Sequence, residues 1–183
     1  MSSRSLGWHE LSPRWAQLLV DEAHVPSGSW VLDIGAGTGA LTGPLLDAGA
    51  RVIAVEAHPD RARHLRRRFG GAIIVVEADA GDLRLPRRPF SVVANPPFAV
   101  TSPLLRRLVQ PGSRLMRADL VTQEQAARRW ASRGAPGAGR WQREFAAELG
   151  RPIPRTALRP PPRVSSRVLR LERRVLQPRG RVR

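Results

Sequence analysis

The sequence contains no cysteine, which excludes disulfide bonds, thiolate zinc sites and a thiol nucleophile. No apolar stretch approaches the roughly 18 residues that a membrane-spanning helix needs. The N-terminal sequence MSSRSLGWHE lacks the apolar segment of a secretory signal, so we expect a cytoplasmic protein. The 4 histidines show no metal-ligand spacing such as HExxH, and no metal site is predicted.

Lysine is absent as well, so all 31 basic residues are arginines, and the net charge is +16. A GC-rich genome would explain the choice of arginine over lysine, but not the excess of positive charge. Residues 1–100 contain 11 arginines and 10 acidic residues, whereas residues 101–183 contain 20 arginines and 5 acidic residues. Guanidinium groups bind phosphates and can stack on unpaired bases. The second half is therefore expected to contact a polyanion such as RNA.

Short apolar segments alternate with helical segments along the 183 residues. Strands are expected at 30–34, 51–55, 73–76, 90–94 and 117–122, and helices at 13–23, 40–48, 59–69, 101–109 and 123–131. This alternation predicts an α/β fold with a mostly parallel sheet and helices on both faces. Two late strands, near 141–149 and 167–171, are expected to form an antiparallel edge. We expect one domain over residues 1–173 and a basic tail over 174–183, which has too little apolar content to fold alone.

A glycine-rich segment, Val31-Leu-Asp-Ile-Gly35-Ala36-Gly37-Thr-Gly39, joins the first expected strand to a helix. Glycines let the backbone turn tightly and approach a ligand without a Cβ atom in the way. Dinucleotide enzymes use a similar turn, but the spacing here is GxGxG rather than GxGxxG. This spacing favours a methyltransferase over an NAD enzyme.

Acidic residues follow the next two expected strands. Glu56 closes the second strand, where a carboxylate can bind both hydroxyls of a ribose. Asp79 follows the third strand, where its oxygen can accept a hydrogen bond from an adenine amino group. Ligands of open α/β sheets bind at the carboxyl ends of the strands, where the glycine turn and both carboxylates lie. Together they predict S-adenosylmethionine as the cofactor.

The tetrapeptide Asn95-Pro96-Pro97-Phe98 follows the fourth expected strand. An amino group on a conjugated ring is a poor nucleophile because its lone pair is delocalised. The Asn95 side-chain oxygen and the Pro96 carbonyl can accept its two N–H groups, in a turn that proline makes rigid. Phe98 can stack on the base. We therefore predict that Asn95, Pro96 and Phe98 are catalytic, through positioning rather than through a strong base.

The motifs VLDIGAGTG, VIAVE, EADA and NPPF, in this order, resemble those of the Erm family of 23S rRNA adenine-N6 methyltransferases. The chain also looks like the small-subunit rRNA dimethyladenosine transferases, at lower similarity. The resemblance covers residues 7–174 and includes LVTQEQAAR at 120–128 and RPPPRVSSRVLRL at 159–171, which general methyltransferases do not share.

The resemblance implies a Rossmann-like class I methyltransferase that modifies an adenine in the peptidyl-transferase region of 23S rRNA. In that family the methyl group blocks macrolide, lincosamide and streptogramin B antibiotics. We expect a monomer that acts on naked or immature rRNA. By position, the implied cofactor-binding residues are Leu11, Gly35, Ala36, Gly37, Glu56, Ala57, Asp79, Ala80 and Asn95. Asn95 and Phe98 would hold the target base.

The chain departs from the family pattern at several places. Trp8-His9-Glu10-Leu11 stands where the family has QNFL, which puts that cofactor contact in question. Leu158 stands near the place of a family phenylalanine, so a second aromatic face for the base is not expected. The resemblance also implies a C-terminal helical lobe that this sequence does not include. We hypothesise that the arginine-rich second half and tail replace part of it, with looser site selection.

Other readings remain open at this point. A protein glutamine methyltransferase also uses an NPP(Y/F) turn, but its substrate does not require so basic a second half. A DNA adenine methyltransferase needs a target-recognition region for which the chain has little room. An RNA-binding module with a vestigial cofactor site is the non-enzyme alternative, and binding of the cofactor would distinguish it.

Overall fold

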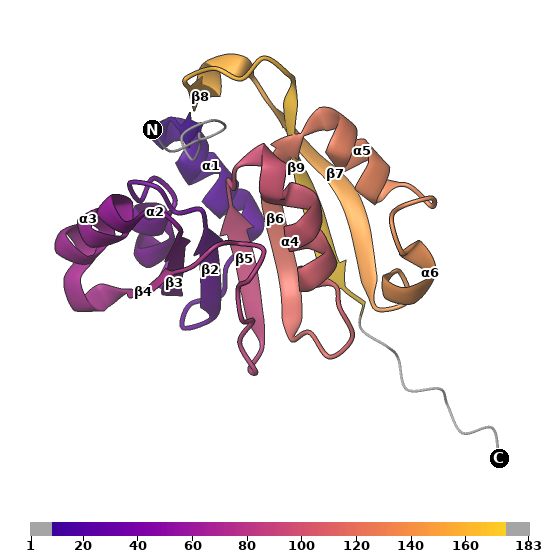
Figure 1. Cartoon of the computed structure of the whole chain (residues 1–183), viewed down its shortest axis with the longest axis horizontal. Coiled ribbons are helices and arrows are strands. Elements are labelled where there is room, and N and C mark those ends of the chain that lie inside the picture. The colour runs from indigo at the N-terminus through magenta and orange to yellow at the C-terminus, as the bar shows by residue number, and fades with distance from the viewer. Residues whose placement is uncertain (1–8, 175–183) are drawn as a thin grey trace.

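A computed structural model describes residues 9–174 and contains a seven-stranded mixed sheet. Its strands are β2 (Trp30–Ile34), β3 (Arg51–Glu56), β4 (Ile74–Glu77), β5 (Phe90–Ala94), β6 (Leu115–Gln123), β7 (Phe145–Ile153) and β9 (Ser166–Arg173). The order across the sheet is β4-β3-β2-β5-β6-β9-β7, and Figure 1 shows β4 at one end and β7 at the other. The strands β4, β3, β2, β5 and β6 are parallel, and β9 runs antiparallel to both β6 and β7.

Helices cover both faces of the sheet, which explains why the parallel strands are apolar almost throughout. The helices are α1 (Pro13–Ala23), α2 (Thr42–Asp47), α3 (Pro59–Phe69), α4 (Thr101–Leu108), α5 (Glu124–Ala131) and α6 (Ala138–Trp141). One hydrophobic core lies between the sheet and α1, α2 and α3. The other core lies on the opposite face, beneath α4, α5 and α6. The predicted α/β fold, with its mostly parallel sheet and antiparallel edge, is confirmed.

The predicted elements differ from the structure mainly where tertiary contacts override local pattern. Trp141, expected in a strand, closes the short helix α6, and β7 begins at Phe145. The indole ring of Trp141 is buried and lies 5.7 Å from the ring of Trp130 on α5, a contact that the local sequence does not reveal. In α1, Leu19 is fully buried, while Trp15 and Leu18 are half-buried.

Two very short strands, which are far apart in the sequence, form a second sheet. The strand β1 (Glu10–Leu11) pairs antiparallel with β8 (Leu158–Arg159), with Glu10 opposite Arg159. Figure 1 shows β8 beside the N-terminal segment, above α1. We call residues His9 to Leu11 the N-terminal strap, because they cross the sheet edge where the parallel strands end.

Within residues 9–174, no helix has the length and apolar character needed to cross a membrane. The basic tail predicted at 174–183 falls almost entirely outside the described residues.

Candidate active site

The glycine turn after β2 is held against the neighbouring strand. The N–H groups of Gly35 and Ala36 both donate to the carbonyl oxygen of Val55, at 2.8 and 3.1 Å. Gly35 has φ +74° and Gly37 has φ +59°, values that L side chains rarely adopt. The turn therefore directs backbone atoms, not side chains, toward the space above the strand ends.

Glu56, at the end of β3, organises this turn from below. Its side chain is buried, and Oε2 accepts the N–H of Gly37 at 2.8 Å while Oε1 accepts the N–H of His58 at 2.8 Å. The guanidinium Nε of Arg61 lies 3.4 Å from Oε1. Oε2 keeps a second lone pair, so Glu56 can support the turn and still accept a ligand hydroxyl.

Asp33, one residue before the end of β2, was not singled out by sequence reasoning. It is 1% exposed, and its Oδ2 accepts the Thr42 hydroxyl at 2.7 Å. Burial raises the pKa of Asp33 to about 7, the Thr42 hydrogen bond opposes this rise, and the charge of Glu56 adds to it. The buried acid in VLDIG was the available signal, because a carboxyl in a fully buried strand needs a partner or a proton.

This raised pKa predicts a pH-dependent stability. The folded state holds the proton more tightly than the unfolded chain, whose ordinary value is 3.8, so the contribution of Asp33 to stability is complete below pH 3.8 and is lost as pH rises through about 7. Asp33→Asn has no charge to bury and accepts the same hydrogen bond. Between pH 5 and pH 8 its stability relative to the unsubstituted protein is expected to rise by about 2 kcal/mol, or roughly 5 °C in Tm. Thermal melts without ligand check this, and a pH-independent difference would contradict it.

The tetrapeptide after β5 packs directly on the glycine turn. A Cβ atom placed on Gly35 would lie 3.2 Å from Pro96 Cα and 3.2 Å from Pro97 Cδ. Pro96 is buried, and Phe98 begins a short 3-10 turn (Phe98–Val100) closed by a hydrogen bond from Val100 N–H to the Pro97 carbonyl. The two motifs therefore form one contact surface.

A matched pair of glycine variants tests this contact. Gly35→Ala and Gly28→Ala both force alanine into positive φ, +74° and +77°, at a cost of about 1–2 kcal/mol each. The Cβ added at Gly28 meets nothing within 4 Å, whereas the one at Gly35 is crowded by two prolines. Urea unfolding should therefore show an additional loss of about 1–3 kcal/mol for Gly35→Ala. Equal losses would show that the two motifs can move apart freely.

The N-terminal strap connects this surface to the late part of the chain. The Asn95 side-chain amide donates to the His9 carbonyl, and His9 Nδ1 donates to the Pro160 carbonyl at 2.6 Å. The rings of His9 and Phe98 have their centroids 5.5 Å apart. Because its N–H is held by the strap, the Asn95 amide has a fixed orientation that leaves Oδ1 as an acceptor.

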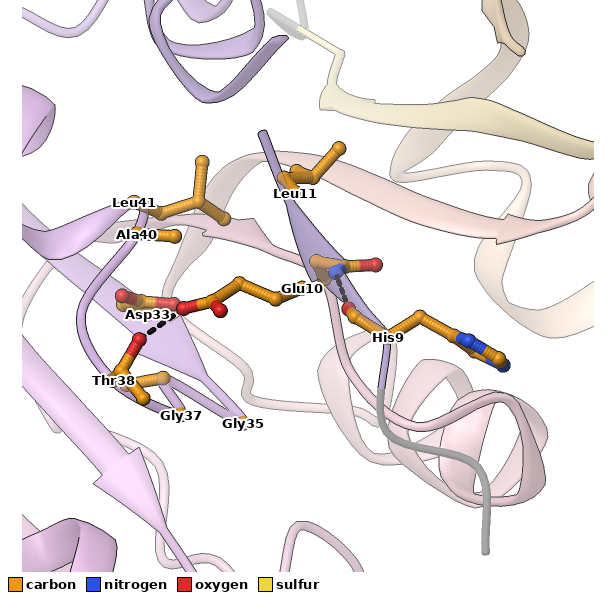
Figure 2. Close-up of a pocket in the computed structure, with 11 residues that line it drawn as sticks. His9, Glu10, Leu11, Asp33, Gly35, Gly37, Thr38, Ala40 and Leu41 are labelled. Carbon is orange, nitrogen blue, oxygen red and sulfur yellow. Dashed lines mark hydrogen bonds between the residues drawn. The ribbon is translucent and has the colours of Figure 1, made fainter. Parts of the chain in front are cut away.

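These elements enclose a pocket of about 260 Å³, drawn in Figure 2. Among the predicted cofactor residues the lining includes Leu11, Gly35, Ala36, Gly37 and Asn95. The lining residues that sequence reasoning did not name as site residues are His9, Glu10, Asp33, Thr38, Ala40 and Leu41. The Glu10 side chain extends from the strap across the pocket and accepts a hydrogen bond from the Thr38 hydroxyl (Figure 2). Periodicity could not reveal Glu10, because its place depends on a two-residue strand.

The other predicted cofactor residues, Glu56 among them, lie outside this lining. Ala57, directly after β3, is exposed, and Ala80 is a buried residue of the loop after β4. Asp79 is exposed, and its Oδ1 accepts the N–H of Gly81 at 2.8 Å. Leu158, where the family has an aromatic residue nearby, is buried in β8 opposite Leu11 and cannot stack on a base.

The strand order, the reversed strand β9 and the glycine turn over the strand ends define the Rossmann-like fold of class I methyltransferases. The crystal structure of the 23S rRNA methyltransferase ErmE superimposes with a TM-score of 0.80 and 28% sequence identity, over 90% of this chain and 69% of that one. The family model for ribosomal RNA adenine dimethylase matches residues 9–181. The chain therefore belongs to the ribosomal RNA adenine dimethylase family.

Named relatives come from both branches that the sequence resembles. Ribosomal RNA small subunit methyltransferase A of Synechococcus sp. (strain JA-3-3Ab) is 38% identical over 174 residues, covering 89% of this chain and 61% of that protein. The mycinamicin-resistance protein MyrB of Micromonospora griseorubida is 38% identical over 148 residues, covering 79% and 47%. The chain thus spans about half to three fifths of the length of these relatives. The expectation that the small-subunit enzymes are the less similar branch is wrong, because both relatives are 38% identical to this chain.

Proposed function

We propose that this chain transfers a methyl group from S-adenosylmethionine to N6 of an adenine in ribosomal RNA. The observation that carries the proposal is the packing of the Asn95–Phe98 turn on the glycine turn, with Asn95 at the wall of the pocket. The turn whose oxygen atoms can accept the N–H groups of a planar amine thus lies at the wall of the glycine-lined pocket.

The residues present fit the proposed cofactor. The pocket has a backbone-lined floor at Gly35 and Gly37, which would receive the methionyl part of the ligand. Glu56, which lies outside the pocket lining and accepts the N–H groups of Gly37 and His58, is the residue that we assign to the ribose hydroxyls. Asp79, in the loop after the neighbouring strand β4, would hold the adenine amino group. When bound, S-adenosylmethionine supplies the electrophilic methyl group.

The protein's own contribution is to present the adenine nitrogen. The Asn95 Oδ1 atom and the Pro96 carbonyl accept its two N–H groups and direct its lone pair toward the pocket. Phe98 stacks on the base. The ring centroids of Phe98 and His9 are 5.5 Å apart, so the imidazole must shift if the base is to stack on the face of Phe98 that His9 covers. The rate gain then comes from orientation and hydrogen bonding.

The arginines support an RNA substrate, although internal ion pairs use part of the excess. Asp119 alone binds Arg117 and Arg170, at 2.6 and 2.9 Å. The segment 154–165, in contrast, has arginines at 155, 159 and 163, all exposed, and no acidic residue. This segment contains β8, which pairs with the strap, so Arg159 lies at the edge of the site. RNA phosphates would bind there with strong salt dependence.

We further propose 23S rRNA, in its peptidyl-transferase region, as the substrate, with macrolide, lincosamide and streptogramin B resistance as the outcome. The likeness to ErmE and to MyrB supports this choice. Small-subunit rRNA is the second candidate, favoured by the Synechococcus relative.

One experiment separates the two. The purified chain is incubated with labelled S-adenosylmethionine and either protein-free 23S rRNA or protein-free 16S rRNA, and modified nucleotides are mapped by primer extension. Label confined to the peptidyl-transferase loop of 23S rRNA is the expected result. Label in 16S rRNA alone would select the second candidate, and binding of the cofactor without any RNA labelling would contradict both.

A further inference from the structure

Glu10 occupies an unusual position for an acidic residue of this chain. It comes from the N-terminal strap, and its carboxylate reaches across the pocket to the hydroxyl of Thr38 on the glycine turn (Figure 2). Its partner opposite in the strand pair is Arg159, yet the side chain of Glu10 lines the pocket. The strap thus contributes a charged group and not only a backbone wall.

The charge of this pocket is opposite to that of the whole chain. The chain carries 31 arginines and a net charge of +16, but among the described residues no arginine lines the pocket. Two carboxyl groups, those of Glu10 and Asp33, do. Burial raises the pKa of Asp33 to about 7, so Asp33 carries only part of a charge at neutral pH. Glu10, which is half-buried, is the carboxylate that solvent and ligand can reach.

Glu10 also separates two cavities. A larger cavity of about 990 Å³ lies on the other side of the strap, between α1 and α2, and the two cavities share Glu10, Leu11, Thr38 and Ala40. The inner one, at about 260 Å³, is the smaller of the two. A ligand that fills the inner cavity must therefore meet the Glu10 carboxylate or displace it from Thr38.

We propose that Glu10 is a specificity-determining residue that favours a ligand with a positively charged sulfur over the same ligand with a neutral one. This inference rests on the proposed function, in which the bound molecule is S-adenosylmethionine and the product is S-adenosylhomocysteine. The two differ by one methyl group and one positive charge at sulfur. A carboxylate in a partly desolvated pocket attracts that charge far more strongly than water would allow. After transfer the attraction is gone, so product leaves more readily.

Titration calorimetry with both ligands tests the assignment. The unsubstituted chain is expected to bind S-adenosylmethionine more tightly than S-adenosylhomocysteine. Glu10→Gln, which has nearly the same shape and still accepts from Thr38, should lower that preference about tenfold, mainly by weakening S-adenosylmethionine. The control is Glu148→Gln, which removes the same charge from the exposed part of β7 and should leave the preference unchanged.

The outcomes are distinct. An unchanged preference in Glu10→Gln, or an equal weakening of both ligands with the fold intact by thermal melting, overturns the assignment of Glu10 to the sulfur. The same drop in Glu148→Gln would also overturn it, because the effect would then be one of overall charge. If the unsubstituted chain binds neither ligand, the proposed function fails and not the selectivity alone.

Discussion

Asn95→Ala is expected to lower methyl transfer to RNA by at least about 100-fold, while affinity for S-adenosylmethionine changes far less. Removing one positioned hydrogen-bonding group from a reaction centre typically costs about 10²–10³ in rate. The Asn95 amide is fixed by its bond to the His9 carbonyl and lies at the pocket wall, so no neighbouring side chain can take over its acceptor oxygen easily. Single-turnover transfer of labelled methyl to RNA measures the loss.

Asn95→Asp is the informative companion. Aspartate keeps a side-chain oxygen for the adenine amino group but cannot donate to the His9 carbonyl. If the acceptor oxygen is the important atom, Asn95→Asp retains clearly more activity than Asn95→Ala. If the anchoring of the strap is what counts, both variants lose activity equally, and an alanine variant with full activity would exclude Asn95 from the reaction altogether.

Glu56→Ala is expected to abolish measurable cofactor binding, with at least a 100-fold loss of affinity, and to destabilise the fold by about 2–4 kcal/mol. The variant leaves the N–H groups of Gly37 and His58 without their acceptor, and the first of these bonds is buried. It also frees the glycine turn that forms the floor of the pocket. Calorimetric titration with S-adenosylmethionine and urea unfolding measure the two effects.

The adjacent strand offers a matched control for Glu56. Glu77 ends β4 directly beside Glu56 in register, but it is exposed and lies 3.7 Å from Arg66 on α3. Exposed ion pairs contribute about 0–1 kcal/mol, so Glu77→Ala should leave both binding and stability nearly unchanged. Similar losses in the two variants would mean that negative charge at this edge matters, rather than the hydrogen bonds of Glu56.

The sheet could be predicted because its signal is local. Segments such as Trp30–Ile34 and Phe90–Ala94 are apolar on both faces and are separated by helices, and their bounds in the structure match the predicted ones. The strand β9, which lies beside the edge strand β7, was also predicted, at 167–171 against Ser166–Arg173 in the structure. Trp141 was misplaced because four residues of helix carry no periodicity. Its contact with Trp130 and the hydrogen bond from its Nε1 to the Pro136 carbonyl fix its position.

The sequence could predict those site residues that directly follow a strand. Gly35, Gly37 and Asn95 each come directly after a buried strand, and the structure brings them to one pocket. Glu10 could not be found this way, because its position depends on pairing with Arg159, a contact between residues far apart in sequence. Contacts of that kind leave no local pattern, so the charge of the pocket became visible only in three dimensions.

Because β1 pairs with β8, the pocket can be completed only late in the synthesis of the chain. The glycine turn, Glu56 and the Asn95–Phe98 turn can take their places once β6 has emerged from the ribosome. The strap gains its partner only when Leu158 and Arg159 have been added, and His9 gains its own only with Pro160. In a nascent chain shorter than this, the strap that contributes His9, Glu10 and Leu11 to the pocket wall would lack its partner strand. If the pocket binds the cofactor as proposed, capture of the cofactor would wait until the segment that carries Arg155, Arg159 and Arg163 is also in place.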